Sequence, residues 1–273
     1  MLRSRLVFLG VLIALAVGST CEAQSASRSA VARSGAAAKP SIVLVHGAFA
    51  DASGWDAVIR ILQAKGYDVS AVQNPLSSYQ ADIETTKRLI DAQTGPTVVV
   101  AHSYGGAVIT AAAAGNPNVK ALVYLAAFAN DVDEPLGALL EKYPSKAVPT
   151  FRPDAAGFLT IDPARFHEIF AQDLPLAQTK VMAVTQKPLT NAAFAATTKV
   201  AAWRTTPSWF VVAQHDNVIN PDLERFFAKR MGATTTEINS SHVVFMSHPK
   251  EVVAVIESAA RAATSTTAAR TQR

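Results

Sequence analysis

The chain has 273 residues, of which 49% are hydrophobic and 17% are charged, and its formal net charge is +4. This composition suits one well-buried α/β domain and excludes a disordered protein. Lys and Arg are scattered along the chain without the clustering that a nucleic-acid groove needs, so we do not expect nucleic acid as a partner.

The first segment has the pattern of a secretory signal peptide. A short basic start is followed by a continuous apolar run at 6–17 and by a small residue, Ala23, at the expected cleavage site. We expect residues 1–23 to be removed on export to the periplasm or the medium, with a retained anchor as the alternative. The apolar run is short for a membrane span, which needs about 20 apolar residues, so we expect no span after cleavage. Cys21 is the only cysteine and would leave with the signal, so the mature chain has no thiol nucleophile.

After a flexible leader at 24–39, strand and helix patterns alternate. This alternation predicts an α/β fold with a mostly parallel central sheet and helices on both faces. The expected strands are 41–45, 67–72, 97–101, 119–128, 208–213 and 234–238. The expected helices are 54–66, 79–93, 107–114, 221–231 and 249–263. The domain therefore spans 40–263, and we expect a disordered tail at 264–273.

Residues 129–206 break this rhythm, because they contain several prolines and short helical patterns but no clear strand. We interpret them as a helical insertion that covers the sheet, and call them the lid. Their aromatic residues either line an apolar substrate pocket or hold the lid on the sheet. These residues are Phe151, Phe158, Phe166, Phe170, Phe194 and Trp203.

The stretch AHSYGG connects the third expected strand to a helix and contains the pattern small-x-Ser-x-Gly. Such a sharp turn needs small neighbours and holds its apex residue in a strained backbone conformation above the sheet. The adjoining helix N-terminus favours negative charge. Ser103 is therefore the candidate nucleophile, and the alternative is an ordinary helix N-cap.

A serine nucleophile needs a base and a group that orients the base. Asp216 follows the strand at 208–213, and His242 follows the last strand. The chain order Ser103, Asp216, His242 is the order that this kind of sheet imposes. We expect His242 to take the serine proton while Asp216 holds the other ring nitrogen.

Other residues compete for these two roles. His248 is an alternative base, although its position before the closing helix favours a cap. Asp131 or Asp133 is an alternative acid. We interpret His102 and His215 as structural, and His167 as an exposed residue of the lid.

The motif HGAF follows the first strand, so its backbone N–H groups can face the serine. The expected oxyanion hole combines the N–H of Tyr104, the residue after the nucleophile, with that of Ala48. Phe49 replaces Ala48 if the loop is rotated by one residue.

With these motifs in order, the sequence from Ser41 to Ala263 resembles the α/β-hydrolase superfamily. The stretches VLVHGAFADASGWDAVIRILQAKGYDV, VVVAHSYGGAVI and SSHVVFMSHP are similar to small single-domain esterases. The related proteins are plant methyl-salicylate esterases, hydroxynitrile lyases and bacterial pyrethroid-type esterases. The resemblance implies an α/β-hydrolase fold, the triad and oxyanion hole named above, and no cofactor or metal.

Two positions depart from the lyases of that family. The hydroxynitrile lyases carry threonine where this chain has Gly47, and lysine where it has Val243. Because that lysine steadies the leaving cyanide, its absence favours hydrolysis.

The function that we expect is a serine carboxylesterase acting on small to medium carboxylic esters. Acyl transfer or perhydrolysis on the same triad is one alternative, and a non-catalytic receptor for a small ligand is another. The expected partner is a small-molecule ester. The sequence carries no indication of an oligomeric state.

Overall fold

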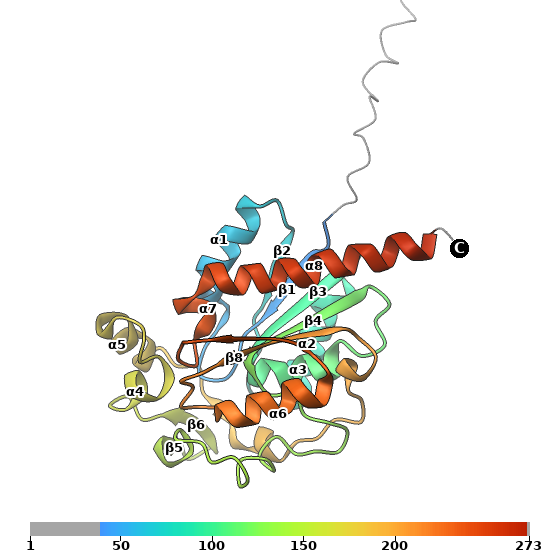
Figure 1. The fold of residues 1–273 in the computed structure, drawn as a ribbon. Helices are drawn as coiled ribbons and strands as arrows, with labels where there is room; N and C mark the ends of the chain where they lie inside the picture. The colour runs from blue at the N-terminus through green and yellow to red at the C-terminus, as the bar shows by residue number, and fades with distance from the viewer. Residues whose placement is uncertain (1–38, 272–273) are drawn as a thin grey trace, which may run out of the picture. The chain divides into compact units, whose positions relative to one another are not determined.

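The computed structural model describes residues 39–271 (Figure 1). The expected signal peptide, the leader up to residue 38 and the last two residues of the expected tail lie outside the described residues. Within the described part, no helix is both long enough and apolar enough to cross a membrane.

A sheet of six strands forms the centre of the fold, and every neighbouring pair of strands is parallel. Its spatial order is β2 (Val69–Val72), β1 (Ser41–Val45), β3 (Thr97–Ser103), β4 (Val119–Ala127), β8 (Ser208–Ala213) and β9 (Thr234–Ile238). The valines of β3 and the apolar residues of β1 are fully buried. Strands that are apolar along their whole length suit a parallel sheet covered on both faces. The expected fold class is confirmed.

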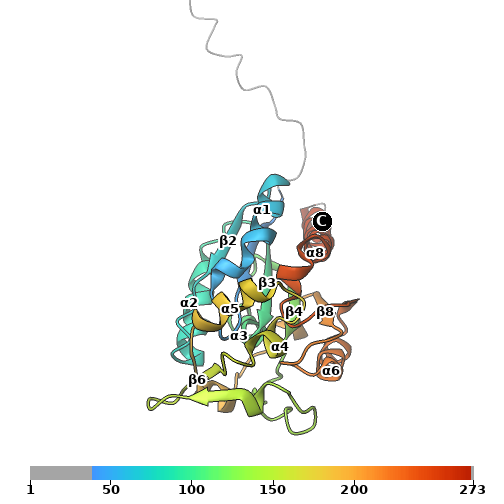
Figure 2. The ribbon, with the colours of Figure 1, turned by 90° about the vertical axis from the view of Figure 1, so that its left-hand side faces the viewer.

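Helices cover both faces of this sheet (Figures 1 and 2). On one face lie α1 (Asp56–Ala64), which follows the short helix η1 (Ala52–Trp55), and α8 (Pro249–Thr271). On the other face lie α2 (Tyr79–Asp91), α3 (Tyr104–Ala112) and α6 (Pro221–Met231). A one-turn helix that the sequence did not predict, α7 (Val244–Ser247), precedes α8.

The start and end of α6 agree with its sequence signals. The side chain of Asn220 accepts a hydrogen bond from the backbone N–H of Asp222, and Pro221 occupies the first turn. Gly232 ends the helix with a φ of 62°, a left-handed conformation that favours glycine. These signals define where the helix that carries residue 224 begins and ends.

Two other boundaries differ from the expected ones. Helix α3 begins at Tyr104 rather than at residue 107, because β3 continues to Ser103 and the turn takes no further residue. Helix α8 continues to Thr271, so the backbone of 264–271 is helical where we expected a disordered tail. After Pro249, no Gly or Pro interrupts α8.

The expectation that the lid contains no strand is wrong. Strands β5 (Phe151–Pro153), β6 (Phe158–Ile161) and β7 (Leu189–Thr190) form a small antiparallel sheet. The turn between β5 and β6 is closed by Asp154, which accepts hydrogen bonds from two backbone N–H groups, and by Gly157 with a φ of 82°. Strands this short leave too few residues to show an alternating pattern.

The rest of the lid consists of short helices. They are η2 (Val148–Thr150), α4 (Phe166–Phe170), α5 (Leu176–Val184), η3 (Asn191–Ala195) and η4 (Ala202–Arg204). The lid aromatic Trp203 is buried, and its indole N–H donates to the carbonyl of Asn130 at 3.1 Å. For this residue the structural interpretation applies, because it holds the end of the lid to its beginning.

Candidate active site

Ser103 sits at a tight strand-to-helix turn. It is the last residue of β3, and its φ of 55° and ψ of −128° lie in a region that non-glycine residues rarely adopt. A Cβ on Gly105 would come within 2.6 Å of the His46 carbonyl oxygen, and one on Gly47 within 2.7 Å of the Ser103 Cβ. The turn that AHSYGG predicts is therefore present, and its close packing leaves no space for side chains at these glycines.

His242 and Asp216 form a buried pair. Nδ1 of His242 donates to Oδ2 of Asp216 at 2.5 Å, and both side chains are fully excluded from solvent. The other oxygen of Asp216 accepts the backbone N–H groups of Val218 at 2.6 Å and Ile219 at 3.0 Å. The loop after β8 thus fixes the carboxylate, and the carboxylate fixes the orientation and tautomer of the ring. Nε2, the nitrogen that a general base would use, is buried and has no hydrogen-bond partner among the described residues.

His102 links this pair to the serine turn. It precedes Ser103, its Nε2 donates to the carbonyl of His242 at 2.9 Å, and the two rings are 4.5 Å apart. Burial lowers the pKa of His102 well below its usual value, so its ring is neutral. No hydrogen bond joins the Ser103 hydroxyl to His242 within the described part of the chain. The serine turn is linked to His242 by the hydrogen bond of His102, the residue before Ser103.

The residues expected to form an oxyanion hole line the same small cavity as Ser103. These residues are Ala48, Phe49 and Tyr104. Among the described residues, no acceptor receives the backbone N–H of Ala48 or of Tyr104. Such unpaired N–H groups beside a serine can stabilise a developing oxyanion. Phe49 lines the cavity as well, with a φ of 60°, so the alternative to Ala48 stays open.

Tyr104 is held in place through its phenol. The hydroxyl donates to Oδ2 of Asp82 at 2.7 Å, and the other oxygen of Asp82 accepts the backbone N–H of Leu76 at 2.8 Å. Burial raises the pKa of Asp82, although both hydrogen bonds act in the opposite direction. Helix α2, which carries Asp82, therefore anchors the residue that follows the serine.

Most of the chain matches a known protein family. The model of the alpha/beta hydrolase family matches residues 42–255 of this chain. The chain belongs to the alpha/beta hydrolase family. No curated protein sequence matches it significantly.

Several solved structures share this fold. A pyrethroid hydrolase from Sphingobium faniae JZ-2 is 20% identical with a TM-score of 0.69, over 81% of this chain and 97% of that chain. An extracellular alpha/beta-hydrolase from a Paenibacillus species is 20% identical with a TM-score of 0.68, over 81% and 99%. Tomato methylketone synthase I is 17% identical with a TM-score of 0.72, over 82% and 98%. At these identities the likeness shows a shared fold.

The cavity over Ser103 in this alpha/beta hydrolase is small and mostly apolar. Its volume is about 20 Å³, room for about one water molecule. The lid supplies two aromatic side chains, Phe151 and Phe194, whose rings are 5.9 Å apart, and Phe49 packs 5.4 Å from Phe151. Ligand pockets usually measure about 300 Å³ or more. The structure therefore describes a closed site.

A second small cavity, of about 80 Å³, lies beyond Phe49, which lines both. It is lined by His102 and by lid residues that include Phe170 and Met182. The ring of Phe170 also packs edge-on against His242, with the ring centroids 5.0 Å apart. The lid aromatics thus divide into those that line a cavity, as the pocket interpretation predicts, and those that hold the lid in place.

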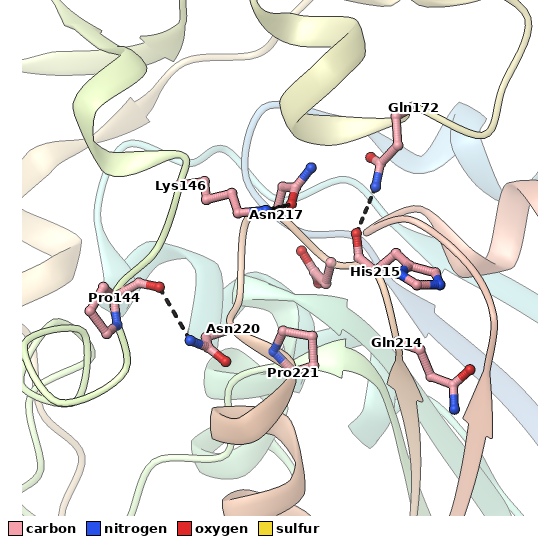
Figure 3. A pocket seen from close by; sticks show the side chains of 9 residues that line it. Pro144, Lys146, Gln172, Gln214, His215, Asn217, Asn220 and Pro221 are labelled. Carbon is pink, nitrogen blue, oxygen red and sulfur yellow. Dashed lines mark hydrogen bonds between the residues drawn. The ribbon is translucent and has the colours of Figure 1, made fainter.

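A larger polar pocket of about 530 Å³ lies beside the Asp216 loop (Figure 3). Its lining includes Lys146, Gln172, His215 and Asn217, and none of its lining residues lines the cavity over Ser103. Lys146 donates to the side chain of Asn217 at 2.8 Å, and Gln172 donates to the carbonyl of His215 at 2.6 Å. Lys146 and Gln172 are therefore engaged with other residues of the same lining.

Two consecutive lid residues hold the loops of the buried pair. Gln172 bonds His215, the residue before Asp216. Asp173 accepts the backbone N–H of Ser241, the residue before His242, at 2.8 Å and its hydroxyl at 2.5 Å. Neither residue was predicted from the sequence, because no local pattern distinguishes them from other polar lid residues.

Glu224, which interacts with Asp216, is a further residue that was not predicted from the sequence. Its side chain is buried on the sheet side of α6, between Leu223 and Phe227 in sequence. Here a signal exists, because a glutamate on the apolar face of an amphipathic helix is rarely buried without a partner.

The competing candidates lie elsewhere. Asp131 forms an ion pair with Arg204 at 2.7 Å, and Asp133 forms one with Lys199. The carbonyl of His248 accepts the N–H of Val252 in the first turn of α8, as expected of a cap.

Two further histidines belong to the Asp216 loop and to the lid. His215 is exposed and lines the polar pocket. The expectation that His167 is exposed is wrong, because it is half-buried and bonds Thr179 at 3.0 Å, which joins α4 to α5. Among residues 39–271, no group of three His, Cys, Asp or Glu could hold a metal ion.

Proposed function

We propose that this alpha/beta hydrolase is a serine carboxylesterase that cleaves small to medium carboxylic esters. The observation that carries the proposal is the fully buried hydrogen bond of 2.5 Å between His242 and Asp216. Ser103 is held in a strained turn, and its neighbour His102 contacts His242. A buried carboxylate on Nδ1 leaves Nε2 as the proton acceptor and stabilises the imidazolium that forms.

The proposed reaction follows the serine-hydrolase scheme. Ser103 attacks the ester carbonyl while Nε2 of His242 takes the hydroxyl proton. The N–H groups of Tyr104 and of Ala48, or of Phe49 in its place, stabilise the oxyanion. The tetrahedral intermediate collapses, and the alcohol leaves with the proton from His242. Water, deprotonated by the same nitrogen, then hydrolyses the acyl-enzyme and restores the serine.

The apolar lining of the cavity supports an ester with an apolar acyl or alcohol part. With room for about one water, the cavity accepts such a group only after lid side chains such as Phe151 and Phe194 move. A pyrethroid hydrolase and a polyneuridine aldehyde esterase are among the structural neighbours, which is consistent with ester hydrolysis here.

The test uses p-nitrophenyl esters of increasing acyl length with the wild type, Ser103→Ala and Ser77→Ala. Ser77 is exposed and outside the cavity, so it serves as the matched control. We expect kcat/KM of Ser103→Ala to fall by about 10⁴-fold or more while Ser77→Ala equals the wild type. Equal rates for the two variants would refute the proposal. No turnover by any of the three would favour a receptor, and product formed only with an added alcohol or peroxide would favour acyl transfer.

We also propose that the protein is exported, on the pattern of residues 1–23. N-terminal sequencing of the protein recovered outside the cytoplasm tests this. A sequence beginning at Gln24 is expected, and one beginning at Met1 contradicts cleavage.

A further inference from the structure

Glu224 is a buried acid with a single protein donor. Its residue is 0% exposed, and Oε2 accepts the backbone N–H of Ala213 at 2.9 Å. The other oxygen, Oε1, is buried and receives no hydrogen bond from a donor among the described residues. A buried carboxylate with half of its acceptors unpaired is costly, so the isolated anion does not suit this position.

The hydrogen bond from Ala213, the last residue of β8, places the carboxyl of Glu224 at the strand end that leads to Asp216. Burial raises the pKa of Glu224, and interaction with the Asp216 carboxyl, including a side-chain hydrogen bond, raises it further. Two carboxyl groups in such contact share one proton, because two buried negative charges repel each other. Asp216 receives three hydrogen bonds, from His242, Val218 and Ile219. Since Glu224 receives one, the negative charge belongs on Asp216 and the proton on Glu224.

We propose that Glu224 is a positioning residue for Asp216, which it holds by donating a hydrogen bond from a neutral carboxylic acid at neutral pH. The role in catalysis rests on the proposed function, in which Asp216 orients His242. The protonation of Glu224 does not depend on that function.

The charged groups around Glu224 agree with this assignment. Burial, followed by the negative charge of Asp216, raises the pKa of Glu224 well above its usual value. The opposing charge is Arg225 on the same helix, whose guanidinium is engaged with Glu237 and Asp222. No cation is in hydrogen-bonding contact with Glu224 among the described residues, so its ionised form is left without a counter-ion.

Removing the donor and replacing it have different expected effects. In Glu224→Gln the amide can donate to Asp216 while its oxygen accepts from Ala213, so we expect kcat within about threefold of the wild type. In Glu224→Leu both bonds are lost. A hydrogen bond to a charged group is worth about 1.5–3 kcal/mol, so we expect kcat to fall by about tenfold to a hundredfold with KM little changed.

The direct test is infrared spectroscopy of the whole protein at pH 7. A protonated carboxylic acid has a carbonyl stretching band that a carboxylate lacks. The difference spectrum of wild type minus Glu224→Gln should contain this band. The matched control, Glu251→Gln, removes an exposed glutamate of α8 and should leave the band in place.

The outcomes separate this proposal from the proposed function. The band together with activity retained in Glu224→Gln and lost in Glu224→Leu supports it. An absent band, or equal loss of kcat in both variants, overturns it. If the band is present but Ser103→Ala keeps full activity, the carboxyl pair stands and the esterase proposal fails.

Discussion

At the scale of single residues, the serine turn depends on glycines without a side chain as much as on the serine itself. Ser103 has a positive φ in a turn whose neighbouring segments pack closely. Positions 47 and 105 therefore have space only for glycine. The space at Gly105 is limited by backbone atoms, the carbonyl oxygens of His46 and Val45, at 2.6 and 2.8 Å from an added Cβ. Backbone cannot rotate away as a side chain can.

Gly105→Ala should therefore be strongly deleterious. We expect a loss of about 1–3 kcal/mol in the free energy of unfolding from overpacking, and a larger relative loss in kcat, because the clash displaces the turn that carries Ser103. Urea denaturation and ester hydrolysis measure the two effects. Gly95→Ala is the matched control, since an added Cβ there meets nothing within 4 Å. Equal kcat for both variants would contradict the argument.

At the scale of elements, the lid and the catalytic loops are tied by polar contacts that are few and local. Asp173 makes both of its hydrogen bonds to Ser241, so this one side chain connects the lid to the loop of His242. Phe170 adds an aromatic contact to the same histidine. Any motion that opens the closed cavity has to keep or break these contacts.

Asp173→Ala should weaken the connection without unfolding the domain. We expect kcat/KM to fall by about tenfold and hydrogen exchange in 166–184 to accelerate, while the free energy of unfolding falls by about 1–2 kcal/mol. The matched control is Glu168→Ala, which removes an exposed ion pair with Arg165 on the same lid. Exposed pairs contribute about 0–1 kcal/mol, so this variant should match the wild type. Indistinguishable hydrogen exchange in the two variants would refute a connecting role.

The sequence predicted the elements whose signals are local and missed those that depend on tertiary contacts. Strands β1, β8 and β9 and helix α6 have the expected bounds, because apolar runs and capping residues define them. The β5–β6–β7 sheet was missed because its strands contain two to four residues.

The same distinction applies to the site. Ser103, Asp216 and His242 stand in motifs at strand ends, so chain order alone selected them, and the structure pairs the last two. Glu224 and Asp173 have no motif of their own. What makes them notable is which side chain each one faces, and this is set by the packing of α6 on β8 and of the lid on the loops.

At the scale of the whole molecule, buried titratable groups of opposite sign set how stability depends on pH. His46 is 1% exposed, its Nδ1 donates to the carbonyl of Gly47 at 2.8 Å, and its Nε2 accepts the N–H of Asn74 at 3.0 Å. Protonation of Nε2 breaks the second bond, and burial lowers the pKa of His46 from 6.5 to about 4. His102 has a lowered pKa for the same reason.

The signs follow from proton linkage. A histidine whose pKa is lowered by folding binds its proton in the unfolded chain first, so its contribution to stability is lost as pH falls from about 6.5 toward 4. Glu224 has a raised pKa in the folded state, so it destabilises the fold as pH rises above about 4.5. Between these limits the two effects oppose each other, and the wild type shows only their difference.

Glu224→Gln should therefore make visible the effect of the buried histidines on the pH dependence of stability. Between pH 6.5 and 5, we expect its free energy of unfolding to fall by up to about 1.4 kcal/mol per pH unit for each buried histidine, more steeply than in the wild type. Urea denaturation at pH 7, 6 and 5 measures the slope. Adding His102→Gln should reduce it by one histidine's share, because the amide can still donate to the carbonyl of His242. Adding His215→Gln, an exposed position, should leave it unchanged. A flat profile in Glu224→Gln would show that the buried histidines do not control acid stability.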